Sequence, residues 1–245
     1  MLVGQRERLI AALEGRLPST PTLRAEKVHT LLISTKDFRP LLDVPSLADA
    51  ARKCDQVCVN LTITGFGGTQ LEPRAPTARV LLERIEELVD FVGDPRRVTW
   101  CFSPILSWRH LTNMSIETFK AIAEKISGTG ISRMMAVFFQ PYDHAKITVD
   151  EVDQVAKMRF IEEMDTIADE LGIRASVCKH GRFHRLKCVD VDYFVDVHPH
   201  KDSSIVDHYR SFPPPKGHCR DVIWDIGWYK PACRCGCLYC YGISA

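Results

Sequence analysis

The 245-residue sequence has neither a long hydrophobic run nor a strong charge of one sign. No stretch approaches the ~20 apolar residues that a membrane helix requires. The opening segment MLVGQRERLIAALEG is charged and amphipathic, unlike a signal peptide. Lys and Arg total 32 and Asp and Glu total 31, a formal charge of +1. We therefore expect a cytoplasmic protein without a membrane partner, and nucleic acid is not indicated unless a local basic patch binds it.

The composition, with 45% hydrophobic and 26% charged residues, is that of a globular protein. Internal repeats and low-complexity tracts are missing as well. We interpret residues 1–245 as a single domain, in which residues 213–245 form a cysteine-rich, metal-binding tail. The Pro-rich stretch at 212–215 is the predicted connector to this tail.

The hydrophobic pattern alternates between predicted strands and predicted helices. The strands are expected at 29–33, 57–64, 98–102, 134–139, 173–178, 193–197 and 222–226. The helices are expected at 5–15, 46–54, 77–92, 115–126 and 149–171, the second starting at Ser46 and the fourth capped by Ser115. This alternation predicts an α/β fold with a parallel sheet. Because seven strands are close to eight, we expect a complete or partial TIM-type (β/α) barrel, with an open doubly wound sheet as the alternative.

Ten cysteines stand out in this composition, and five of them fall in the last 27 residues. Cys233, Cys237 and Cys240 follow the spacing C-x3-C-x2-C, with Tyr239 before the last one. Three thiolates can hold three corners of a [4Fe–4S] cluster and leave the fourth iron open. That iron could bind the amino and carboxylate groups of S-adenosylmethionine. The compact Gly236 suits a loop whose N–H groups approach the cluster sulfurs.

The same spacing resembles the signature of radical S-adenosylmethionine enzymes. In most of that superfamily the cysteines follow the first strand of the barrel, whereas here they follow the last predicted strand. The two ends of a closed barrel are neighbours, so a motif after either end can face the same mouth.

A second resemblance covers roughly residues 28–241. The segment 225–229, together with the three cysteines and the run Leu-Tyr-Cys-Tyr at 238–241, resembles the C-terminal signature of domain-of-unknown-function family 1848. Further matches are found at 62–65, 71–73, Pro76 and 104–106. The resemblance implies a radical-SAM-like barrel with an iron–sulfur centre and no known reaction. The chain departs from the family in starting at the helix that follows the first strand, and in having Cys101 where a basic residue is usual.

Zinc is the main alternative to iron. Cys219 could join Cys233, Cys237 and Cys240 as a fourth thiolate in a tetrahedral zinc site, and a tail that binds no metal is the third possibility. Disulfides are not expected without a secretion signal. We interpret Cys235 as an outward-facing bystander or as an alternative ligand.

The loop at 65–74 follows a predicted strand and is the expected cofactor-binding segment. The bare backbone at Gly67 and Gly68 would let a ligand approach closely. Glu72 could hold the amino group of S-adenosylmethionine, which resembles the glycine-glycine-glutamate element of radical SAM enzymes. Alternatively, this is a plain turn with Glu72 in solvent. Arg74 would bind a carboxylate or phosphate, or pair with Glu72.

Other cysteines and histidines are weaker candidates. Cys178, Cys188 and Cys219 could form a second metal site, or Cys178 could simply end a buried strand. Cys54, Cys58 and Cys101 are predicted to serve packing alone. His198 and His200 are expected on a surface loop, although they could also project from a strand end.

The function that these patterns favour is a radical-SAM-type enzyme. The reduced cluster would cleave S-adenosylmethionine to a 5′-deoxyadenosyl radical, which acts on an unknown substrate. Its catalytic residues are not identified, and an electron donor such as a ferredoxin or flavodoxin is the expected partner. The alternatives are a non-enzymatic zinc or iron–sulfur binding module and an enzyme that repairs nucleic-acid lesions.

Overall fold

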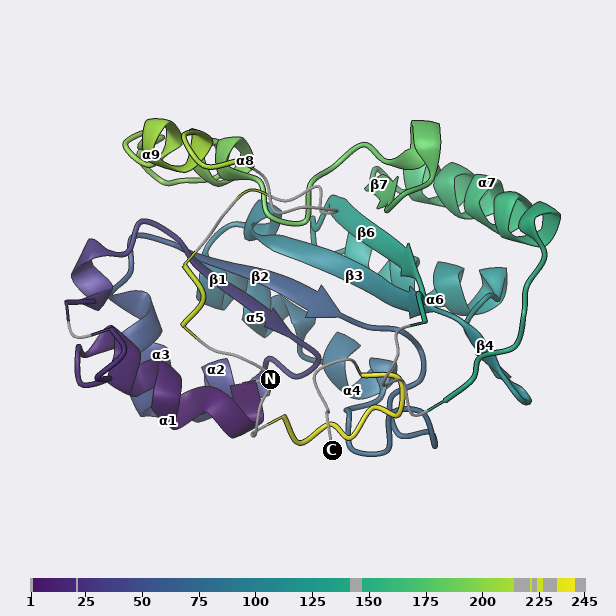
Figure 1. Cartoon of the computed structure of the whole chain (residues 1–245), viewed down its shortest axis with the longest axis horizontal. Coiled ribbons are helices and arrows are strands. Elements are labelled where there is room, and N and C mark those ends of the chain that lie inside the picture. Colours follow the sequence, from purple (N-terminus) through teal and green to yellow (C-terminus); the bar gives the residue numbers. More distant parts are fainter. Residues whose placement is uncertain are drawn as a thin grey trace.

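The computed structural model describes residues 2–20, 22–141, 147–213, 221, 224–226 and 233–240. Its centre is a sheet of five parallel strands (Figure 1). These are β1 (Leu31–Thr35), β2 (Val57–Thr62), β3 (Val98–Ile105), β6 (Arg133–Phe138) and β7 (Arg174–Val177). They lie in the order β1-β2-β3-β6-β7, so each strand pairs with the next one in the chain. A small antiparallel hairpin, β4 (Ser107–Trp108) with β5 (Leu111–Thr112), follows β3.

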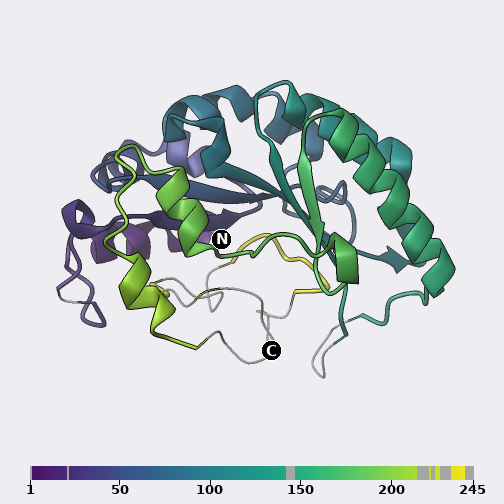
Figure 2. The same ribbon diagram turned by 90° about the horizontal axis from the view of Figure 1, so that it is seen from above.

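Helices flank this sheet. They are α1 (Leu2–Leu13), α2 (Arg39–Asp43), α3 (Pro45–Arg52), α4 (Ala78–Leu82), α5 (Ile85–Val92), α6 (Ile116–Ser127), α7 (Gln154–Glu170), α8 (Val191–Asp196) and α9 (Val206–Arg210). Three short 3-10 helices lie at Ala25–Lys27, Pro95–Arg97 and Gly181–Phe183. Figure 2 shows α5, α6 and α7 along the outer side of the curved sheet, with α8, α9 and the yellow tail segment on the opposite side.

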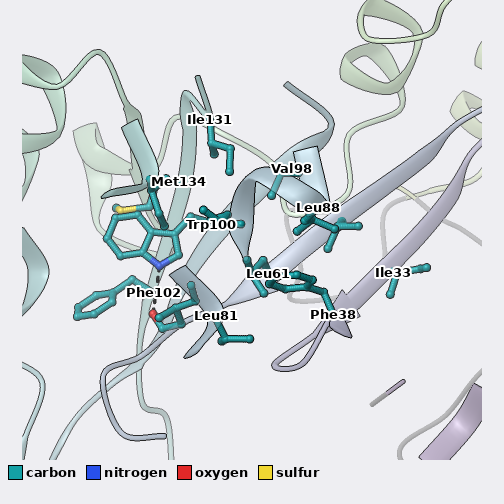
Figure 3. Close-up of a cluster of buried hydrophobic side chains, with 14 of the residues drawn as sticks. Ile33, Phe38, Leu61, Leu81, Leu88, Val98, Trp100, Phe102, Ile131 and Met134 are labelled. Carbon is teal, nitrogen blue, oxygen red and sulfur yellow. Dashed lines mark hydrogen bonds between the residues drawn. The ribbon is translucent and has the colours of Figure 1, made fainter. Parts of the chain in front are cut away.

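The alternation of side chains along each strand explains this arrangement. On the outer face, β3 places Trp100 and Phe102 in the main core (Figure 3). Both rings pack around Phe119 of α6. The indole Nε1 of Trp100 donates a hydrogen bond to the carbonyl of Ile63, 3.1 Å away. This bond satisfies the polar atom of a fully buried ring.

The opposite face of the sheet is more polar. Near β1 and β2 it is covered by α8, because Cys58 packs with Phe194 and Val197 in a small separate cluster. Asn60 and Cys101 point to this same side further along the strands, and both are half-buried. The inner face therefore carries hydrogen-bonding side chains close to the carboxyl ends of the strands.

The predicted α/β class with a mostly parallel sheet is confirmed. The described residues do not close a barrel, since the sheet has five strands and remains open between β1 and β7. This open sheet agrees with the alternative prediction of an open doubly wound sheet. The strand order follows the chain without reversal, which is also the order found in half of a (β/α) barrel. Within the described residues, no helix combines the length and the apolar character needed to cross a membrane.

Most predicted elements are present with shifted ends. Ser115 caps α6 as predicted, its hydroxyl accepting from the Thr118 N–H at 3.1 Å. The helix predicted at 77–92 is interrupted between α4 and α5, where Arg84 binds both Asp43 and Glu87. Ser46 does not cap a helix, because α3 begins one residue earlier with Pro at its first turn.

Two predicted strands are not confirmed. Residues 193–197 belong mostly to the helix α8, since the side chain of Asp190 accepts from the Tyr193 N–H and caps that helix. Of the strand predicted at 222–226, residues 222–223 lie outside the described part, and 224–226 have no strand structure. Cys219 and most of the segment 213–245 also lie outside it. The division into one domain and a tail stays a prediction.

Candidate metal centre

The segment 233–240, here called the cysteine loop, lies against the loop that follows β2. The N–H of Leu238 donates to the carbonyl of Leu71 at 3.0 Å, and the N–H of Arg74 donates to the carbonyl of Cys235 at 3.1 Å. Around these bonds a second apolar cluster contains Phe66, Leu71, Ala75, Leu106, Trp108, Cys235, Cys237 and Tyr239. The cysteine loop thus sits at the carboxyl ends of β2 and β3, where parallel α/β proteins place their functional sites.

Two of the three predicted ligands are linked through the backbone, since the N–H of Cys240 donates to the carbonyl of Cys237 at 3.1 Å. Cys237 is 5% exposed, while Cys233 and Cys240 are half-buried. The pKa of the Cys237 thiol is raised to about 12, chiefly by burial. The charge of Lys36 lowers it, and the negative charges of Glu72, Cys240 and Cys233 contribute to the rise. Such a thiol stays protonated at neutral pH unless a cation stabilises the thiolate.

The donor set fits an iron–sulfur cluster. Three soft thiol donors occur in a water-poor loop, and the turn between two of them passes through Gly236 at a φ of +68°. Among the described residues, no three Cys, His, Asp or Glu side chains are close enough together to hold one single ion. In a [4Fe–4S] cluster each cysteine ligates a different iron, so the three thiols need not surround one ion. The binding of a cluster stays a prediction.

Cys235 does not face outward as expected. It is buried in the second apolar cluster, and its thiol donates a hydrogen bond to the sulfur of Cys233. This bond lowers the pKa of Cys233 and raises that of Cys235. The expectation failed because the backbone bond to Arg74 turns this part of the loop inward.

Glu72 is buried rather than solvated, with 2% of its surface exposed. Its Oε1 accepts hydrogen bonds from Lys36 Nζ at 3.0 Å, from Thr64 Oγ1 at 2.6 Å and from the hydroxyl of Tyr239. Lys36 also lies 5.6 Å from the centre of the Tyr239 ring. The interpretation of Glu72 as a solvated turn residue is therefore wrong, and its role toward S-adenosylmethionine stays a prediction.

Gly67 and Gly68 bring the loop against its own continuation. A Cβ on Gly67 would lie 2.0 Å from the carbonyl oxygen of Pro76, and Gly68 has a φ of +81° beside Thr77. The N–H of Gly68 donates to the carbonyl of Glu72 at 3.0 Å. The close approach of the loop to its own continuation therefore accounts for glycine at both positions. Contact of these glycines with a ligand stays a prediction.

The second cysteine group is arranged differently from the prediction. The pKa of the Cys101 thiol is raised to about 12, mainly by burial and to a smaller extent by the charge of Cys188. Asn60 donates to the carbonyl of Cys188 at 3.3 Å. Cys178 follows β7 and is half-buried, and Cys219 lies outside the described residues. The influence of Cys188 on Cys101 was not predicted.

The remaining sequence candidates are packing or loop residues. Cys54 and Cys58 are buried, as predicted. His200 is exposed, but His198 is buried and stacks on His29 at 4.3 Å between ring centres. The expectation of a surface position for His198 is therefore wrong, because the turn that follows α8 folds it against the start of β1.

Sequence reasoning missed Thr64 and did not single out Lys36 as a member of the site. Each follows the end of a parallel strand, at the same edge as the cysteine loop. That position was the available signal, because side chains just past the carboxyl ends of adjacent parallel strands meet.

Comparison with known proteins gives one family and no individual relative. The model of the family described as domain of unknown function DUF1848 matches residues 10–242. Neither the curated proteins nor the solved structures yielded a match. Since the match covers most of the sequence, the chain belongs to the DUF1848 family.

Proposed function

We propose that this protein is an iron–sulfur enzyme of the radical SAM type, with Cys233, Cys237 and Cys240 as ligands of a [4Fe–4S] cluster. The observation that carries the proposal is the docking of the cysteine loop at the carboxyl ends of β2 and β3. We further propose that the sheet is part of a (β/α) barrel, which the uninterrupted strand order supports.

A bound cluster would supply one electron to S-adenosylmethionine and so generate a 5′-deoxyadenosyl radical. The chain's own residues provide the surroundings for this chemistry. The apolar side chains of Phe66, Leu71 and Trp108 keep water from the cysteine loop. Asn60 and Cys101 lie half-buried in β2 and β3 on the inner face, which is the proposed side for an unknown substrate. A ferredoxin or flavodoxin in the cytoplasm is the proposed electron donor.

Anaerobic reconstitution tests the proposal. The purified chain is incubated with iron and sulfide, and the cluster is followed by absorption and by EPR before and after S-adenosylmethionine is added. We expect a reducible cluster whose EPR signal changes with S-adenosylmethionine. Cys237→Ala and Cys240→Ala should abolish it, while the buried Cys54→Ala should retain it. A chain that takes up no iron contradicts the proposal.

A metal-binding module without enzymatic activity is the second candidate. It is favoured by the extensive packing of the cysteine loop on residues 71–75, which a metal could reinforce. Stoichiometric zinc after purification, together with a lower melting temperature after chelation, would support this candidate. An EPR signal that responds to S-adenosylmethionine would exclude it.

A further inference from the structure

The site contains one buried carboxylate that joins three separate parts of the chain. Glu72 Oε1 accepts from Lys36 after β1, from Thr64 after β2 and from Tyr239 in the cysteine loop. The side chains of Lys36 and Glu72 are only 16% and 3% exposed. A carboxylate removed from water to this extent requires such donors, and losing one leaves a costly unpaired group.

Three further contacts hold the cysteine loop without using a sulfur atom. The backbone of Leu238 and that of Cys235 each form one hydrogen bond with the segment 71–74. The guanidinium of Arg74 lies against Gly236. Since these contacts involve no thiol, they can form whether or not a metal is bound.

We infer that Glu72 is a positioning residue, whose carboxylate ties Tyr239 to the ends of β1 and β2 and thereby docks the cysteine loop before any metal arrives. The inference rests on the proposed function only in taking the cysteines as metal ligands. It goes further by assigning Glu72 to the loop instead of to a bound small molecule. A loop that is already docked does not need a metal to hold it in place.

Hydrogen exchange of the metal-free, full-length chain tests this inference directly. In the wild type we expect the amides of Leu238 and Arg74 to be protected. Tyr239→Phe removes one hydrogen bond to a buried charge. We expect the amides of Leu238 and Arg74 to exchange about tenfold faster or more in this variant. Glu72→Gln should do the same. In the double variant, amide exchange should be accelerated by less than the product of the two single accelerations, because both changes break the same contact.

Tyr193→Phe is the matched control. Its hydroxyl donates to the carbonyl of Arg96, far from the cysteine loop, so its removal should leave exchange at 233–240 unchanged. Amides of β2 and β3 serve to check that each variant is folded. If Glu72→Gln fails to fold, Tyr239→Phe decides alone.

A chemical measurement separates positioning from general stability. Cys237 is 5% exposed, and the rate at which iodoacetamide alkylates its thiol is measured in the metal-free chain. Tyr239→Phe should speed this alkylation, whereas Tyr193→Phe should match the wild type. Unprotected loop amides in the metal-free wild type, or equal exchange and equal alkylation rates in Tyr239→Phe and wild type, would overturn the inference. Neither the exchange nor the alkylation result depends on whether iron or S-adenosylmethionine binds, so a failure of the proposed function remains distinguishable.

Discussion

Arg74 and Gly236 are in direct contact: a Cβ placed on Gly236 would lie 2.9 Å from the Nη2 atom of Arg74. The glycine also has a φ of +68°, where other residues are strained. A side chain at this position therefore has to strain the turn and displace the guanidinium. The turn between Cys235 and Cys237 thus depends on a residue without a side chain.

Gly236→Ala should consequently impair the cysteine loop. We expect a left-handed backbone cost of about 1–2 kcal/mol, the displacement of Arg74, and a lower iron content after reconstitution. Gly172→Ala is a suitable control, because Gly172 has the same φ of +68° and a Cβ added there would meet no atom within 4 Å. In the control variant the free energy of unfolding should fall by a similar amount, because the backbone cost is the same. Its iron content after reconstitution should equal that of the wild type. Equal iron contents in both variants would contradict this prediction.

Cys235→Ala should retain the metal. Cys235 donates its hydrogen bond to Cys233 and packs among apolar side chains, so we interpret it as a neighbour of the ligands. We expect the iron stoichiometry of the wild type, with a shifted cluster reduction potential because a hydrogen bond to Cys233 is lost. Iron analysis and redox titration measure both. A loss of iron comparable to that in Cys237→Ala would make Cys235 a ligand.

His198 should make folding sensitive to acid. Its Nδ1 accepts from the N–H groups of His200 at 3.2 Å and Asp202 at 3.3 Å, so protonation at Nδ1 places a proton between two donors. Burial lowers the pKa of His198, the neighbouring His29 and His200 lower it further, and the carboxylates of Asp55 and Asp202 oppose this. A folded pKa below the unfolded one means that stability is present above about pH 6.5 and is lost as the pH falls.

Urea unfolding between pH 8 and pH 5 measures this effect. The free energy of unfolding should fall with decreasing pH by no more than about 1.4 kcal/mol per pH unit from this single proton. His198→Gln should flatten that part of the profile, whereas the exposed His208→Gln in α9 should not. Identical profiles for wild type and His198→Gln would contradict the assignment.

Trp100→Phe should destabilise the fold without touching the metal centre. The substitution removes the hydrogen bond to Ile63 and leaves both a buried carbonyl unpaired and a gap beside Phe119. We expect a loss of about 2–4 kcal/mol in the free energy of unfolding. Iron content per folded chain should equal that of the wild type. A change below about 1 kcal/mol would show that the core can repack around the missing ring.

Local sequence signals predicted those elements whose determinants are themselves local. The cap of α6 at Ser115 and the five strands of the sheet follow from side-chain pattern alone. The segment 193–197 has the β-branched and aromatic residues of a strand, but Phe194 and Val197 pack three residues apart on the inner face of the sheet. This is a tertiary contact, and it outweighs the strand propensity of the individual residues.

The candidate site was predictable only in part for the same reason. The spacing of the cysteines is visible in one short segment, whereas Lys36 and Glu72 are 36 residues apart and meet through the sheet. Burial of Cys235 depends on the segment 71–75, which no pattern within the tail reveals. Lys36 and Glu72 can be recognised as members of one site only when the order of the strands in the sheet is known.

The hydrogen bond between Tyr239 and Glu72 spans 167 residues and also orders events in time. At about 5–20 residues per second, the ribosome adds the cysteine loop roughly 10–30 s after Glu72. All five described strands have been synthesised by then, because the last of them ends at Val177, so the loop is added to a chain whose sheet residues are already complete. A chain that stops short of residue 233 carries the five described strands of the parallel sheet and none of the three cysteines, so the proposed metal site exists only in molecules whose synthesis has run through to the tail.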